Sequence, residues 1–121
     1  MEEGDAFPEA RAWRCSSKFV EKERILMATT YHEPTAELSA ETRNIHRALT
    51  SLIEELEAVD WYNQRVDVTD DPQLKAILAH NRDEEIEHAS MCLEYLRRLM
   101  PAFDNELRTY LFTSAPIDQV E

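Results

Sequence analysis

Two long stretches of helical periodicity, separated by a single turn, constrain the fold of this chain most strongly. Apolar residues recur at helical spacing from position 39 to about 65 or 67, and again from 72 to about 99. Between them, residues 68–72 form a predicted turn in which Asp71 suits a helix cap and Pro72 a first helical position. Two helices of about 25 residues joined by so short a turn must pack antiparallel. The sequence therefore predicts a helical hairpin.

Other boundaries follow from capping and breaking residues. Ser39 is a suitable cap for the first long helix, and Pro101 ends the second. A short third helix is predicted at residues 102–112. One glycine among 121 residues argues against turn-rich β architectures, so the predicted fold class is all-α. The expected organisation is a flexible N-terminal extension over residues 1–36, a helical domain over 37–117 and a C-terminal tail over 118–121.

The charge and the cysteines limit the classes of partner. A formal net charge of −12 disfavours nucleic acids and anionic membrane surfaces, which need basic patches. This charge favours cations as binding partners, or it serves only to keep the protein soluble. No apolar run reaches the roughly 18 residues that span a bilayer. The two cysteines are far apart and outside any CxxC pair, which indicates a reducing compartment and a cytoplasmic protein.

Polar residues interrupt the apolar face of each long helix near its middle. Glu55 lies on that face of the first helix, and Glu85 and His88 lie on that of the second. Glu55 comes about 14 residues before Thr69, and the Glu85-x-x-His88 pair about 16 to 19 after it, so at about 1.5 Å per residue their depths are similar. A lone Glu-x-x-His arises often by chance. Three such residues at one depth favour metal binding.

A hairpin of two helices cannot cover its apolar faces alone, and a twofold dimer is the commonest solution. Such a dimer is a four-helix bundle with one Glu from each first helix and a Glu-x-x-His from each second helix. This is the ligand set of ferritin-like di-iron proteins. Carboxylates and imidazole suit iron or manganese. The sequence therefore predicts a di-iron site between two chains, in which each chain supplies Glu55, Glu85 and His88.

Four further residues lie near this face of the first helix. Tyr62 is two turns from Glu55 and can donate a hydrogen bond near the metals, although a tyrosine at such a position is more often a core residue. Glu54, Glu57 and Trp61 lie to one side. Periodicity alone favours a solvated acidic face for these three over a metal-uptake site.

Three strings of the sequence, in order and spacing, resemble the encapsulated ferritins: EELEAVDWYNQR at 54–65, ILAHNRDEEIEH at 77–88 and LRTYLFT at 107–113. The resemblance covers residues 32–117. Residues 1–26 have no counterpart. The family's C-terminal extension carries an encapsulin-targeting peptide, which residues 118–121 do not resemble.

The resemblance implies a ferroxidase that oxidises Fe²⁺ with O₂ at a di-iron site between subunits. It also implies an annular homodecamer, carried as cargo by the encapsulin shell protein of an iron-storing nanocompartment. By position, Glu55, Glu85 and His88 resemble the iron ligands and Tyr62 the tyrosine beside them. The resemblance also assigns metal uptake to Glu54, Glu57 and Trp61.

Two alternatives remain open. In the first, the inner carboxylates bind Ca²⁺ or Zn²⁺ only to hold a helical module together, and calcium is also a candidate at the uptake or interface sites. In the second, a di-iron oxidoreductase acts on another substrate, which ranks last because the sequence predicts no extra helices to enclose a pocket. Oxygen consumption with Fe²⁺ separates the ferroxidase from the non-catalytic module.

Overall fold

The structure, a computed structural model, describes residues 31–121. Most of the extension predicted over residues 1–36 lies outside the described residues, and its flexibility stays a prediction. Residues 31–37, which contain a short 3₁₀ helix, η1 (Thr35–Glu37), belong to a unit separate from Leu38–Glu121. The second unit contains the long helices and is all-helical, without a strand anywhere in its length.

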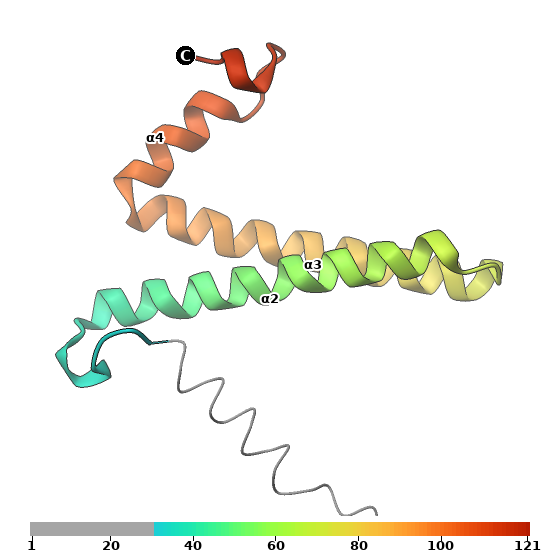
Figure 1. Cartoon of the computed structure of the whole chain (residues 1–121), viewed down its shortest axis with the longest axis horizontal. Coiled ribbons are helices and arrows are strands. Elements are labelled where there is room, and N and C mark those ends of the chain that lie inside the picture. Colours follow the sequence, from blue (N-terminus) through green and yellow to red (C-terminus); the bar gives the residue numbers. More distant parts are fainter. Residues whose placement is uncertain (1–30) are drawn as a thin grey trace, which may run out of the picture. The chain divides into compact units, whose positions relative to one another are not determined.

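The two long helices begin at the predicted caps. Helix α2 spans Ala40–Val68, and the Ser39 side chain accepts a hydrogen bond of 3.1 Å from the Thr42 amide. Helix α3 spans Pro72–Leu99, and Asp71 accepts one of 2.7 Å from the Leu74 amide. Figure 1 shows α2 and α3 running side by side in opposite directions. The helical hairpin is confirmed.

The third helix differs by one or two residues at each end from the predicted span of 102–112. Helix α4 spans Pro101–Tyr110. It starts at the proline because a first helical position needs no amide hydrogen. It ends at Tyr110 because Leu111 already has an extended backbone, with φ −78° and ψ 147°, and Phe112 follows with a positive φ of 60°. A second 3₁₀ helix, η2 (Ile117–Gln119), follows near the C-terminus.

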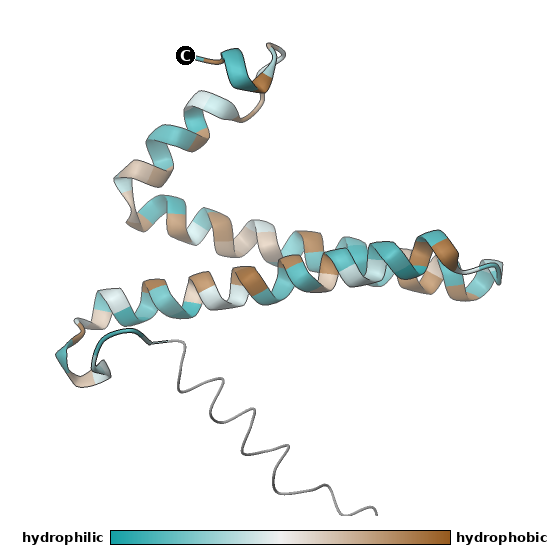
Figure 2. Cartoon of the chain, in the orientation of Figure 1, coloured by the Kyte–Doolittle hydropathy of each residue, from teal (hydrophilic) through white to brown (hydrophobic). Residues whose placement is uncertain are grey.

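The hairpin buries little of its apolar surface. Among residues 31–121, Ala89 and Leu96 on α3 are buried, at 7% and 0% exposure. The predicted inner face of α2 is half-buried, and Figure 2 shows hydrophobic and hydrophilic residues alternating along both long helices. Large apolar side chains remain exposed on the outer faces of the hairpin. They include Ile53, Leu56, Ile86 and Met91.

The described helices do not suit a bilayer. In the part of the chain from residue 31 onward, no helix combines the length and the apolar character that crossing a membrane requires.

Candidate metal centre

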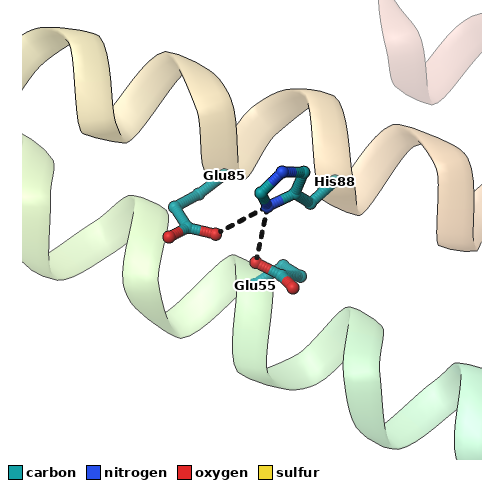
Figure 3. A group of neighbouring side chains, drawn as sticks. All are labelled: Glu55, Glu85 and His88. Atoms are coloured by element: carbon teal, nitrogen blue, oxygen red, sulfur yellow. Dashed lines mark hydrogen bonds and ion pairs between the residues drawn. The ribbon is translucent and has the colours of Figure 1, made fainter.

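Three side chains from the two long helices converge at mid-hairpin, as the sequence predicted. Figure 3 shows Glu85 and His88 on α3 facing Glu55 on α2. His88 Nδ1 lies 3.2 Å from Glu85 Oε2 and 3.6 Å from Glu55 Oε2. One candidate ligand atom from each residue lies within 4.8 Å of the other two. We call these three residues the metal cluster.

The cluster assembles because of helix periodicity and hairpin depth. Glu85 and His88 are three residues apart, so they project from the same face one turn apart. Glu55 reaches them from the opposite helix at a matching distance from the turn. The site therefore depends on the register between α2 and α3.

The three groups shift one another's pKa values. The hydrogen bond with Glu85 raises the pKa of Glu55, and partial burial and the negative charge of Glu85 act in the same direction. The hydrogen bonds with Glu55 and His88 lower the pKa of Glu85. The hydrogen bond to Glu85 raises the pKa of His88, although partial burial opposes the shift. The raised pKa values of Glu55 and His88 favour their protonated forms, which reduces the repulsion between the two carboxylates, and a bound cation would do the same.

The donor set fits iron. Carboxylate and imidazole ligands are those that iron and manganese accept, and the cluster contains no thiolate. One chain offers three ligating residues, fewer than the six donors of an octahedral ion. The side chains of His88, Glu55 and Glu85 remain 44%, 27% and 24% exposed, so further ligands can approach from outside the hairpin.

The other predicted residues do not join the cluster. Tyr62 is half-buried on the inner face of α2, and its ring lies 5.2 Å from the Arg65 guanidinium carbon. Glu54 and Glu57 are exposed, as is Trp61 at 54%. Exposure suits both the solvated face and the uptake site, so metal uptake stays a prediction.

The sequence did not predict two polar networks. Arg82 on α3 donates a hydrogen bond of 3.1 Å from Nη1 to Asn63 Oδ1 on α2. At the other end of α3, Arg97 donates to Glu94 through Nε and Nη2 at 2.6 and 2.7 Å, and through Nη1 to Asp104 on α4. Spacing of three or four residues reveals pairs within one helix, but it gives no signal for contacts between helices.

Known proteins resemble this chain closely. A ferritin-like protein from Thermotoga maritima is 59% identical over 95 residues, which cover 78% of this chain and 83% of that protein. An encapsulated ferritin-like protein from Rhodospirillum rubrum is 62% identical over 90 residues, covering 74% of this chain and 64% of that protein. An encapsulin nanocompartment cargo protein, EncC, from Myxococcus xanthus is 47% identical over 47 residues, or 39% of this chain and 36% of EncC.

A solved structure shares the fold. The crystal structure of protein ne0167 from Nitrosomonas europaea matches with a TM-score of 0.70 at 69% identity, over 72% of this chain and 96% of that one. The model of the EncFtn-like family matches residues 30–114, which include both long helices and all three cluster residues. This chain therefore belongs to the EncFtn-like family.

Proposed function

We propose that this protein is a ferroxidase, which oxidises Fe²⁺ to Fe³⁺ with O₂ at a site shared by two chains. The observation that carries the proposal is the metal cluster: two carboxylates and an imidazole gathered within 4.8 Å on facing helices. Each Fe²⁺ gives up one electron, so a pair of ions supplies two electrons to O₂. Carboxylate oxygens suit the Fe³⁺ product because they are hard anionic donors.

The second chain completes the site in this proposal. A single hairpin provides one Glu and one Glu-x-x-His, which is half of the ligand set of a ferritin-like di-iron protein. The ligands are partly open to solvent, and apolar side chains such as Ile53, Leu56 and Ile86 are about half exposed nearby in the sequence. A twofold partner would cover this apolar surface and add the other ligands. The expected larger assembly is a homodecamer.

Within the site, the residues of this chain have distinct roles. Glu55, Glu85 and His88 are the ligands, and Nδ1 is the imidazole atom that faces the carboxylates. Tyr62 is assigned to the surroundings of the metals as a hydrogen-bond donor. Glu54, Glu57 and Trp61 are assigned to uptake, with exposed carboxylates that attract Fe²⁺ before it reaches the ligands. Calcium is a further candidate at the uptake or interface sites.

The cellular setting is part of the proposal. Two relatives bear the names encapsulated ferritin-like protein and encapsulin nanocompartment cargo protein. We infer that this chain passes oxidised iron to storage inside an encapsulin nanocompartment of the cytoplasm. Co-expression with an encapsulin shell protein tests this partner: the chain should co-purify inside intact shells and resist added protease there. A chain that stays outside the shells and is degraded would contradict it.

Oxygen uptake tests the activity. Fe²⁺ is added without air, and O₂ consumption and Fe³⁺ absorbance are followed once air is admitted. The variants Glu85→Ala and His88→Ala should lose rapid oxidation. The matched control is His80→Ala, which removes a 72% exposed imidazole from the same helix. Wild-type initial rates in both site variants would refute the assignment.

The same experiment separates the alternatives. A non-catalytic module would bind Fe²⁺, Ca²⁺ or Zn²⁺ and associate, but it would consume no O₂ above the rate of free Fe²⁺. An oxidoreductase with another substrate would need that substrate for turnover. The proposal requires O₂ consumption with Fe²⁺ as the sole reductant.

A further inference from the structure

Polar contacts join α2 to α3 at two depths of the hairpin. The first is the metal cluster, in which His88 Nδ1 lies 3.6 Å from Glu55 Oε2. The second is the hydrogen bond of 3.1 Å from Arg82 Nη1 to Asn63 Oδ1. By sequence this second contact lies between the cluster and the turn that connects the helices. It is close to the cluster, because Arg82 is one turn before Glu85 on α3.

The Arg82 side chain is held in place before it reaches α2. Its Nε and Nη2 atoms lie 3.0 and 2.9 Å from Oδ1 of the neighbouring Asp83. This leaves Nη1 for Asn63. A guanidinium is a planar, rigid fork, so fixing one edge also fixes the direction of the other. The Arg82 side chain is 27% exposed, whereas Asn63 is exposed, so the bond lies at the surface of the hairpin.

The apolar faces of the hairpin specify register only weakly. A slip of α3 by one turn would still place Leu78 at the position of Leu74 and Leu96 at that of Cys92, so part of the apolar contact would survive. It would bring Cys92 to the position of His88 opposite Glu55, and Ile86 to the position of Arg82 opposite Asn63. Polar residues on such faces are known to fix register, because a slip leaves them without partners. The turn fixes one end of the hairpin, but the cluster lies about 20 Å from it.

The contact between Glu55 and His88 changes when a metal binds. A cation held by both carboxylates and the imidazole would replace this contact and would itself join the two helices. Before a metal arrives, the helices are aligned by this contact and by the bond between Arg82 and Asn63. The Arg82 bond is present with and without metal, because neither residue belongs to the ligand set.

We propose that Arg82 and Asn63 are positioning residues, whose hydrogen bond between the helices holds Glu55 opposite Glu85 and His88 for metal binding. The inference rests on the proposed metal site. Arg82 then acts on the metal through the register of α3 and not by contacting it. Removing either side chain should weaken metal binding by the cluster, and removing both should weaken it no further.

An anaerobic titration with Co²⁺ tests this role, since Co²⁺ accepts nitrogen and oxygen ligands and its visible absorption reports their geometry. Arg82→Ala and Asn63→Ala should each bind Co²⁺ about tenfold more weakly than wild type, with an altered spectrum. The double variant should match the single variants. Asn63→Asp, which keeps an acceptor for Arg82, should restore wild-type affinity and spectrum.

Arg98→Ala is the matched control. It removes an equally charged side chain from α3, but Arg98 pairs with Glu94 on the same helix. Its Co²⁺ affinity and spectrum should equal those of wild type. Circular dichroism verifies the helix content of each variant. Asn63→Ala changes an exposed residue, so this variant alone tests the positioning role if Arg82→Ala fails to fold.

The outcomes separate the two proposals. If wild type binds Co²⁺ and both alanine variants bind it with unchanged affinity and spectrum, the positioning role is wrong and the metal site stands. Independent, additive losses in the double variant would also contradict the role. If wild type itself binds no Co²⁺ through Glu85 and His88, both the metal site and the positioning role are refuted.

Discussion

His88 Nδ1 on α3 lies 3.6 Å from Glu55 Oε2 on α2, and this contact joins the two arms of the hairpin at the metal cluster. The folded hairpin thus gathers three candidate ligands within one chain. The cluster is nevertheless half open, with 44% of the His88 side chain exposed. In the proposed dimer, a second chain supplies the remaining ligands and the missing cover.

Ferroxidase activity should therefore depend on association. The initial rate of Fe²⁺ oxidation per chain should rise with chain concentration across the range in which dimers form, because in the proposed shared site a lone chain holds half of the ligand set. Stopped-flow absorbance together with light scattering at each concentration measures this. An unchanged rate per chain in samples that scatter as monomers would contradict a shared site.

Glu54 and Glu57, which are proposed to take up metal, should affect the rate at which Fe²⁺ reaches the ligands. Replacing Glu54 and Glu57 together by glutamine should slow oxidation about two- to fivefold at low Fe²⁺ concentration, because two negative charges that attract the cation are lost. The saturated rate should not change. Oxidation rates over a range of Fe²⁺ concentrations measure both quantities.

A matched pair on the same helix serves as the control for uptake. Glu41→Gln with Asp67→Asn removes the same charge from exposed positions near the two ends of α2. This control should oxidise iron at the wild-type rate throughout. Equal slowing in the two double variants would mean that net charge causes the effect, and it would refute the uptake site.

Low pH should weaken the network of Glu94, Arg97 and Asp104, which joins α3 to α4 through the bond from Arg97 to Asp104. The hydrogen bonds from Arg97 and then Arg98 lower the pKa of Glu94 from 4.5 to about 2, and those from Arg108 and Arg97 lower the pKa of Asp104. A carboxyl whose pKa is lower in the folded state stabilises that state fully above its unfolded pKa. The stabilisation is lost as the pH falls through the folded value. The window for Glu94 is therefore about pH 4.5 to 2.

Denaturant unfolding of wild type and Arg97→Met at pH 6, 4 and 3 measures this attachment. Wild type should have the higher free energy of unfolding at pH 6. The difference in this free energy between wild type and Arg97→Met should shrink toward pH 3 as the carboxylates are protonated. Arg98→Met, which removes a 72% exposed arginine with no bond to α4, should show a smaller difference at pH 6. A difference for Arg97→Met that stays constant with pH would contradict the network's role.

The small core should be sensitive at Leu96. This side chain is fully buried, so Leu96→Ala should lower the free energy of unfolding by about 2–4 kcal/mol through lost burial and a cavity. Val68→Ala, at a position 76% exposed, should change it by less than about 0.5 kcal/mol. Guanidinium unfolding at one fixed chain concentration compares the two. Equal effects would mean that the hairpin core contributes little to stability.

The sequence predicted the features that depend on local chemistry and periodicity. Ser39, Asp71 and Pro72 mark the helix starts because their capping and turn preferences act over a few residues. The cluster was predictable because Glu55 and the Glu85-x-x-His88 pair interrupt otherwise apolar faces at equal depth.

The features that were not predicted depend on geometry between helices. The contact from Arg82 to Asn63 requires side-chain directions that periodicity does not give, since Asn63 is exposed and appears as an ordinary surface residue. The bond from Arg97 to Asp104 depends on the angle between α3 and α4, which meet at Met100. The end of α4 was predicted too late because Leu111 and Phe112 leave the helical conformation although neither is a glycine or a proline, the residues that mark a helix end in a sequence.

The central claim is that two chains complete one di-iron site, and native mass spectrometry during anaerobic Fe²⁺ titration tests it most directly. The account predicts that metal-bound species contain pairs of chains and hold two irons per two chains, and that His88→Ala binds none at the same Fe²⁺ concentration while His80→Ala matches wild type. Monomers that retain iron, or dimers of His88→Ala that still hold two irons, would contradict it.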